Sequence, residues 1–364
     1  MKTKQLAVAA LAAALSMSAF WARNTQAAGG PTVDKTSVVV WMNKQGVYFP
    51  KPGAGNYNTW AWLPRVDFRV NGPIEEGTKF VVDYTAGKGP VIRSEVSGET
   101  VTENRGYTFE GVGSDVSEEK GSIHTGPVSM QIRVVNPAQK LDQVIYKGTL
   151  DVKKYLPYDP KQFPDFKNKY DYYVDQDWRL PIAFLTSRWI GSDGNPETTP
   201  PLALKLWFRG DSGEVEGKTE AQLFYQGQPI STCNPGTRSW TTTETSKFTW
   251  TEASFTFLGG ENNRPVFYSS QDGTDSYPTA HLLDKNPGEY EIKVTHKGKL
   301  SRSIKFTIGS DGKPVDQGAA AALNTRGRWP VAVKIVEQTD GKWDANAWKT
   351  GMFYGNPIAS LIKP

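Results

Sequence analysis

The sequence contains very few of the residues that most often carry catalysis or hold metal ions. Its 364 residues include one cysteine, Cys233, and three histidines, His124, His281 and His296. A single cysteine excludes an intramolecular disulfide, so a secreted chain of this kind must be stabilised by its hydrophobic core. No two histidines have the spacing of zinc ligands, and the hydrolase, zinc-protease and phosphate-loop motifs are absent. We therefore expect no catalytic residues, no metal and no cofactor.

Long hydrophobic runs are also scarce, and the one apolar stretch is short for a membrane span. It covers residues 5–21, follows Lys2 and Lys4, and precedes the small residues of Thr25-Gln26-Ala27. This pattern is typical of a bacterial secretory signal peptide cut after Ala27, and a membrane anchor is the alternative. No cysteine follows that could carry a lipid, and residues 358–364 are too few for an anchor. We expect a periplasmic or extracellular protein.

The expected mature chain has no excess of charge of one sign. Residues 1–27 contain three of the 42 basic residues and none of the 38 acidic ones, which leaves 39 basic residues against 38 acidic ones. Such a balance gives no overall field that favours nucleic acid or an anionic membrane surface. We expect no nucleic-acid partner and no membrane span after cleavage.

What the sequence does contain favours strands over helices. It has 35 glycines, 24 prolines and many aromatic residues, and it shows no long amphipathic helical pattern. This composition suits short strands joined by turns. We predict an all-β fold.

The clearest strand signal is a hairpin over residues 290–308. Apolar and polar residues alternate on both sides of Lys297-Gly298-Lys299, where Gly298 suits a tight turn. The apolar positions are Tyr290, Ile292, Val294, Ile304, Phe306 and Ile308. One face of this hairpin must be buried, so a second sheet has to cover it.

The start of this hairpin carries a resemblance to a known fold. Asn286-x-Gly288-x-Tyr290 resembles the turn and tyrosine before strand F of immunoglobulin-like and fibronectin-like β-sandwiches. In those folds the tyrosine hydroxyl bonds back to nearby backbone. Ile292 occupies the position at which antibody domains have cysteine, so the resemblance is to the fold and not to the disulfide-bearing family. A fold-level resemblance implies no function.

Segments of the first half of the chain recur in the second half in the same order. Residues 64–70, 74–78, 84–91 and 130–134 are similar to residues 201–209, 215–219, 224–230 and 290–294. We predict two tandem immunoglobulin-like β-sandwich domains with a C-terminal docking extension. The predicted parts are residues 1–27 (signal peptide), 28–153 (first domain), 154–178 (aromatic-rich linker), 179–310 (second domain) and 311–364 (linker and C-terminal extension).

Two of these parts have unusual composition. Residues 154–178 contain too many aromatic residues for a flexible linker, so we expect them to pack on a domain or between two domains. The segment from Arg328 to Val336 is similar to the start of the second domain. It is expected to dock on a neighbouring domain or to add a strand to another copy of the chain.

Tyr57, Trp60 and Trp62 are the candidate ligand-binding residues. Two residues apart on a strand, Trp60 and Trp62 share a face, and they lie beside a loop rich in glycine and proline. Exposed, they would form a stacking platform for sugar rings or for a proline-rich peptide. The alternative is that both belong to the core, since sandwiches commonly bury tryptophan.

Three functional hypotheses follow. The first is a secreted, non-enzymatic binding or structural protein of the bacterial envelope, whose partner is an envelope protein or a glycan. The second is a carbohydrate-binding accessory protein that uses exposed tryptophan and tyrosine. The third is a glycan-active hydrolase, because a glycosidase needs only two carboxylates about 5–10 Å apart.

Overall fold

The computed structural model describes residues 30–43, 60–101, 106–117, 120–186, 201–240, 247–259, 263–269, 277–316, 323–325, 327–337 and 341–342. Within these ranges the protein is built from strands, and α2 (Ser212–Glu216) is its only α-helix. The predicted all-β class is confirmed. None of the described helices is long and apolar enough to cross a membrane.

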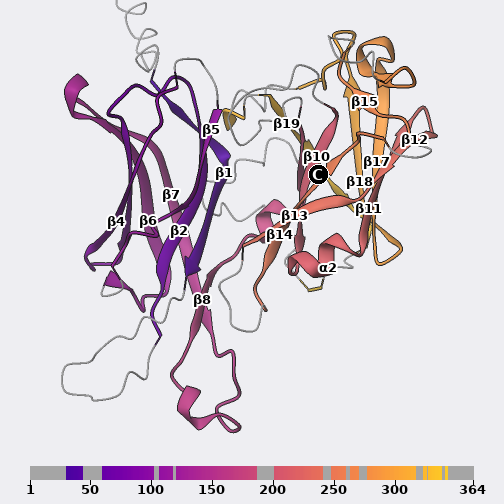
Figure 1. The fold of residues 1–364 in the computed structure, drawn as a ribbon. Coiled ribbons are helices and arrows are strands. Elements are labelled where there is room, and N and C mark those ends of the chain that lie inside the picture. Colours follow the sequence, from indigo (N-terminus) through magenta and orange to yellow (C-terminus); the bar gives the residue numbers. More distant parts are fainter. Residues whose placement is uncertain are drawn as a thin grey trace, which may run out of the picture.

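The first unit, indigo to magenta in Figure 1, consists of two antiparallel sheets. The smaller sheet has the order β1-β2-β5, with β1 (Thr32–Asn43), β2 (Leu63–Asn71) and β5 (Gly106–Val112). The larger sheet has the order β4-β3-β6-β7-β8, with β3 (Lys79–Ala86), β4 (Val91–Ser97), β6 (Gly126–Asn136), β7 (Leu141–Tyr155) and β8 (Asp171–Val174). Short 3-10 helices follow β6, β7 and β8, namely η2 (Pro137–Gln139), η3 (Pro164–Phe166) and η4 (Asp177–Arg179).

The second unit, drawn in pink to yellow, also has two large sheets. One has the order β13-β14-β10-β9-β19, with β9 (Ile182–Thr186), β10 (Ala203–Arg209), β13 (Pro235–Trp240), β14 (Trp250–Thr256) and β19 (Arg328–Ala332). The other has the order β12-β11-β17-β18-β20, with β11 (Thr219–Tyr225), β12 (Gln228–Cys233), β17 (Gly288–His296), β18 (Lys299–Ile308) and β20 (Lys334–Ile335). The short strands β15 (Val266–Phe267) and β16 (His281–Leu282) pair in parallel, and η6 (Leu283–Lys285) leads into β17.

Each unit encloses its own hydrophobic core between its two large sheets. The alternation of the sequence explains this arrangement, because successive side chains of a strand point to opposite faces. In β17, for example, Tyr290, Ile292 and Val294 are buried in the second core. The predicted hairpin is confirmed, since β17 pairs with β18 from Gly288 to His296.

The two units share one strand order. The sheet β1-β2-β5 corresponds to β9-β10-β14, and the sheet β4-β3-β6-β7 corresponds to β12-β11-β17-β18, with the strands in the same chain order. The repeated sequence segments lie on equivalent strands: residues 64–70 and 201–209 reach β2 and β10, and residues 130–134 and 290–294 lie on β6 and β17. The sequence similarity between the halves therefore has a topological counterpart.

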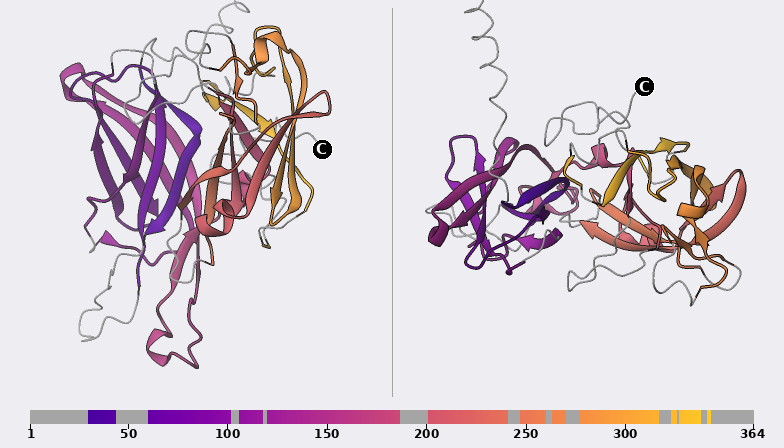
Figure 2. Two further views of the ribbon diagram at one scale, coloured as in Figure 1. Left: turned by 45° about the vertical axis from the view of Figure 1, so that its right-hand side comes forward. Right: turned by 90° about the horizontal axis from the view of Figure 1, so that it is seen from above.

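The units lie side by side, as the view from above in Figure 2 shows. Side chains on the outer face of the β1-β2-β5 sheet are buried between them. An interface cluster consists of Val39, Leu180, Trp207, Trp240 and Trp250, with Trp41, Tyr173 and Phe248 packed against it. Val38, Val40 and Met42 on the other face of β1 belong to the first core. The continuous apolar run in β1 is thus explained by burial on both faces.

The polar face of β2 is also buried in this interface. The carboxylate of Asp67 accepts a hydrogen bond from Trp240 Nε1 at 2.9 Å and pairs with Arg238 Nη2 at 2.7 Å. The same carboxylate accepts from the backbone N–H of Gly111 at 2.7 Å. Burial raises the pKa of Asp67, and the Gly111 and Arg238 contacts oppose that rise by stabilising the charged form.

The free edge of β1 is capped by side chains that come from the segment between the units. Arg179 Nη1 donates to Thr36 O at 2.7 Å, and a second guanidinium nitrogen donates to Val38 O. Gln176 Nε2 donates to Val40 O at 3.0 Å. These bonds satisfy carbonyls that an exposed edge strand would offer to another chain.

The C-terminal segment joins the units further. β19 pairs with β9 and β20 pairs with β18, so one segment extends both large sheets of the second unit. Arg328 Nη1 lies 2.8 Å from a carboxylate oxygen of the fully buried Asp34, and Asn324 Nδ2 donates to Thr32 Oγ1 at 2.6 Å. The segment from Arg328 to Val336 therefore docks within its own chain, and self-association through it stays a prediction.

Candidate functional site

The two tryptophans of the candidate platform are buried, with exposed fractions of 8% for Trp60 and 1% for Trp62. Trp62 packs in the first core, and its Nε1 donates to His124 O at 2.8 Å. The ring of Trp60 meets that of Phe166 edge-on, with centroids 5.9 Å apart. Neither ring therefore offers an open stacking face, because neighbouring segments cover both. Tyr57 lies outside the described residues.

The residues with the most reactive side chains occupy structural positions. His281 Nε2 lies 2.8 Å from the hydroxyl of Tyr290, and burial lowers the pKa of His281 to about 4. His296 Nε2 lies 3.1 Å from Glu214 O. Burial raises the pKa of Cys233 to about 12, so its thiolate is negligible at neutral pH. The described part of the chain contains no cluster of three or more histidines, cysteines or acids suited to a metal.

Two carboxylates do approach one cation, but they do not form a catalytic pair. Arg238 binds both Asp67, at 2.7 Å, and Glu110. Asp67 is buried beside the indole N–H of Trp240 in the interface, with 4% of its surface exposed. An acid pair of a hydrolase must reach a substrate in a cleft, whereas these acids are engaged in holding the units together.

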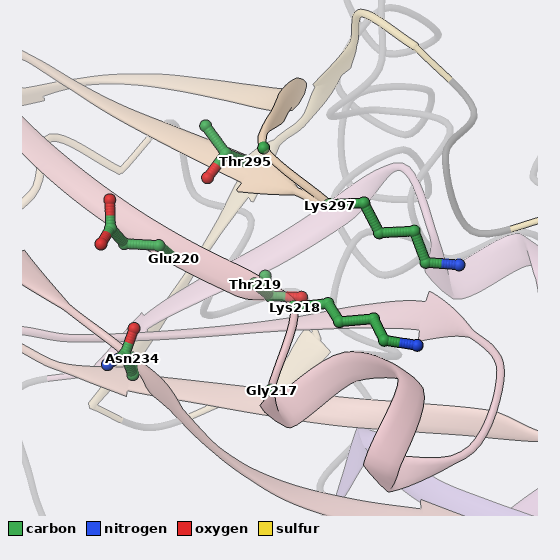
Figure 3. A pocket seen from close by; sticks show the side chains of 8 residues that line it. Gly217, Lys218, Thr219, Glu220, Asn234, Thr295 and Lys297 are labelled. Carbon is green, nitrogen blue, oxygen red and sulfur yellow. The ribbon is translucent and has the colours of Figure 1, made fainter.

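An open depression of about 600 Å³ lies between α2, β11 and the β17–β18 turn (Figure 3). The side chains of Lys218 and Lys297 extend to one side of it and that of Glu220 extends to the other. Both lysine ammonium groups bind Glu214, at 2.5 and 3.0 Å. The two lysines are thus paired with Glu214 and extend away from Glu220, so the depression does not gather its charged groups around one point.

The remaining candidate is the arm, which we define as residues 153–170, the last three residues of β7 and the segment that leads to β8. β8 pairs with β7 from Val152 to Tyr155, so the chain leaves the sheet, turns and returns to it. The predicted linker therefore starts as a hairpin that projects beyond the sheets of both units (Figures 1 and 2).

The tip of the arm is ordered by its own contacts. Tyr158, Phe163 and Phe166 form an aromatic cluster with ring centroids 4.9 to 6.3 Å apart. Asp159 Oδ1 accepts from the backbone N–H of Lys161 at 2.9 Å, and Asp159 O accepts from the N–H of Phe163 at 2.9 Å. The arm therefore presents its tip on a stable turn.

Phe163 is the exposed member of this cluster, with 45% of its surface open to solvent. Phe166 is half-buried and is anchored on Trp60, so the buried tryptophan of the candidate platform supports the arm. Lys169 lies over the Phe166 ring at 4.1 Å and Lys154 lies over the Tyr170 ring at 4.4 Å. The arm thus combines an apolar tip with cationic sides.

The base of the arm is fixed to the second unit. The rings of Tyr173 and Phe248 stack with centroids 3.8 Å apart, and Tyr155 meets Phe248 at 4.8 Å. Aromatic pairs of this kind contribute about 0.5–1.5 kcal/mol beyond their buried area. Tyr155 and Tyr173 therefore pack against the second unit, as expected, whereas Phe163 is exposed on the projecting tip.

Sequence reasoning singled out the aromatic residues of this segment but not its lysines. Residues 153–170 contain five lysines and two aspartates, an excess of positive charge that the balanced total of the chain conceals. Counting charge in a local window would have revealed it. The projection of the hairpin depends on strand pairing and could not be read from composition.

Comparison with known proteins gives no identification. No family model matches this chain, and no curated protein matches it.

Proposed function

We propose that this protein is an extracytoplasmic, non-catalytic binding protein of the bacterial envelope, built from two tandem immunoglobulin-like β-sandwiches that hold the arm in position. The observation that carries the proposal is the arm itself, an ordered hairpin with an exposed Phe163 and an excess of lysines. Exposed aromatic residues on a projecting element are typical of binding surfaces and have no role in the stability of the two cores.

The immunoglobulin-like assignment is supported by topology and by one hydrogen bond. Both units pair a three-stranded arrangement with a four-stranded one in the same order, and antiparallel sheets packed in this way are characteristic of that fold. The hydroxyl of Tyr290, near the start of β17, donates to Asn286 O at 2.6 Å. This is the bond of the tyrosine corner that the resemblance implied.

The extracytoplasmic location is supported by residues 1–27, whose basic start, apolar centre and small residues suit cleavage and export. A fractionation experiment tests it: the protein expressed in a bacterium should appear without residues 1–27 in the periplasm or the medium. Full-length protein retained in the cytoplasm would contradict the assignment.

Envelope binding is tested with an arm-less variant in which Asn-Gly replaces residues 156–170. Tyr155 and Asp171 are cross-strand partners, so a two-residue turn preserves the ladder between β7 and β8. The mature protein should sediment with isolated bacterial envelopes, and the arm-less variant should remain in the supernatant. Equal circular dichroism spectra of the two proteins control for folding. Sedimentation of both proteins to the same extent would refute the role of the arm.

A further inference from the structure

We infer that the arm binds the anionic lipid surface of a membrane, with Phe163 entering the headgroup region and the lysines facing the headgroups. This inference rests on the function proposed above and specifies its ligand class. It involves contact with a surface only, and none of the described helices is long and apolar enough to cross a membrane.

The charge of the arm favours an anionic partner. Residues 153–170 contain Lys153, Lys154, Lys161, Lys167 and Lys169. Within the described part of the chain only Lys153 of these forms an ion pair, with Asp175 at 3.4 Å. Lys154, Lys161 and Lys167 are exposed. Basic side chains near an anionic leaflet each strengthen binding several-fold, and their long stems let the ammonium groups stay in the polar layer.

The position of Phe163 favours a membrane surface as the partner of the arm. Phe163 precedes η3 on the turn of the arm. Because the arm projects beyond the two units, its end can contact a flat membrane surface without obstruction by the sheets (Figures 1 and 2). Aromatic rings flanked by lysines are the combination that binds at the headgroup level. Tyr158 and Phe166, both half-buried, contact the Phe163 ring edge-on and widen the apolar surface.

The arrangement of the other rings disfavours a glycan at the same place. A sugar ring stacks on an open aromatic face, but Lys169 covers a face of Phe166 and Lys154 covers a face of Tyr170. The rings of the tip cluster meet edge-on, at interplanar angles of 62 to 76°. The tip is therefore an apolar point rather than a flat platform, and the lysines of residues 153–170 outnumber its aspartates by five to two.

The test uses sedimentation of the mature protein with vesicles. One set contains equal parts of phosphatidylglycerol and phosphatidylcholine, and the other contains phosphatidylcholine alone. We expect binding to the first set and not to the second. We also expect binding to weaken strongly when salt rises from about 0.1 M to about 1 M, because the screening length falls from roughly 10 Å to 3 Å.

Two variants and two matched controls assign the binding to the arm. Replacing Lys161 and Lys167 by glutamine should weaken binding to anionic vesicles roughly 30-fold, and Phe163→Ser should weaken it about tenfold. The controls are the exposed Lys305 and Lys313 replaced by glutamine, and Val315→Ser, whose side chain is 61% exposed. Both controls lie on the second unit and should bind like the wild type.

Insertion is measured with an environment-sensitive fluorophore on a Gln162→Cys variant. Gln162 is exposed beside Phe163, and the half-buried Cys233 with its raised pKa reacts slowly, so labelling is selective. The emission should shift to the blue on addition of anionic vesicles. An unchanged emission with bound vesicles would overturn the insertion of the tip.

The outcomes separate this inference from the proposed function. Arm-dependent binding to whole envelopes without binding to anionic vesicles would overturn the lipid inference and leave the envelope function standing. Arm-dependent binding to an acidic polysaccharide such as polygalacturonate, with none to vesicles, would do the same and identify a glycan partner. Envelope binding that does not depend on the arm would overturn both.

Discussion

The hydroxyl of Tyr290 is the most informative single group in the second unit. It donates to Asn286 O at 2.6 Å, and its one proton is thereby used. His281 Nε2 lies 2.8 Å from the Tyr290 hydroxyl oxygen, so it must carry a proton and donate it to that hydroxyl oxygen. The hydroxyl oxygen of Tyr290 thus joins β16 to the turn before β17, and only 2% of Tyr290 is exposed.

Tyr290→Phe should lower the free energy of unfolding by about 1–3 kcal/mol, because it leaves Asn286 O and the imidazole N–H without their buried partner. Urea denaturation monitored by tryptophan fluorescence measures the change. Tyr277→Phe is the matched control, since Tyr277 is 40% exposed and a surface change of this size costs less than about 0.5 kcal/mol. Equal losses in the two variants would show that the buried bond contributes nothing.

The imidazole of His281 should make stability depend on pH. Burial lowers its pKa to about 4, with a further contribution from Arg264, whereas the unfolded chain has the ordinary value near 6.5. As pH falls, His281 therefore binds a proton in the unfolded state before it does so in the folded state. The stability that neutral His281 contributes is lost as pH falls from about 6.5 to about 4. The loss between pH 7.5 and 4.5 should be roughly 2 kcal/mol.

Urea denaturation of His281→Gln at both pH values tests this dependence. The variant should lose roughly 2 kcal/mol less than the wild type on acidification. The half-buried His124, replaced by glutamine, is the control and should follow the wild type. A His281→Gln variant with the full wild-type loss would assign the pH dependence to other groups.

At the scale of elements, β19 and β20 show how a short segment protects two sheet edges. Without them β9 and the part of β18 at Arg302 and Ser303 would present unpaired backbone groups, which are templates for association with another chain. The same segment brings Arg328 to Asp34, so the edge cover also joins the two units.

A chain that ends at residue 325 should therefore be less stable and should self-associate, whereas a chain that ends at residue 337 retains both strands and is the matched control. Light scattering after size-exclusion chromatography measures the mass, and urea denaturation measures the stability. The loss should be at least about 3 kcal/mol, because the buried carboxylate of Asp34 loses its cation. Two monomeric chains of equal stability would contradict the role of the segment.

At the scale of the whole molecule, the interface between the units resembles an interior rather than a surface. Four of the 12 tryptophans, Trp41, Trp207, Trp240 and Trp250, belong to it. Arg179 is 2% exposed, stacks over Trp178 at 4.2 Å and over Trp207 at 4.9 Å, and caps β1. We expect the two units to unfold together in one transition.

Arg179→Ala should separate that transition into two and destabilise the first by roughly 2–4 kcal/mol, because carbonyls of β1 lose their donor inside the interface. Differential scanning calorimetry resolves the transitions. Arg93→Ala is the control, since its ion pair with Asp83 is half-exposed at the arginine and worth less than about 1 kcal/mol. One unchanged transition in Arg179→Ala would show that the units are coupled by other contacts.

Alternation in the sequence predicts the strands and the β17–β18 hairpin, and the resemblance at Asn286-x-Gly288-x-Tyr290 implies the bond of Tyr290, because these features depend on residues that are close together in the chain. What covers each face of a strand depends on segments that are distant in the sequence. Alternation in β2 distinguishes Val66 and Phe68 from Arg65 and Asp67, but it does not reveal that the polar set is buried as well. The same holds for Trp60, whose ring is covered by a residue more than one hundred positions away, since burial is a property of contacts between distant segments.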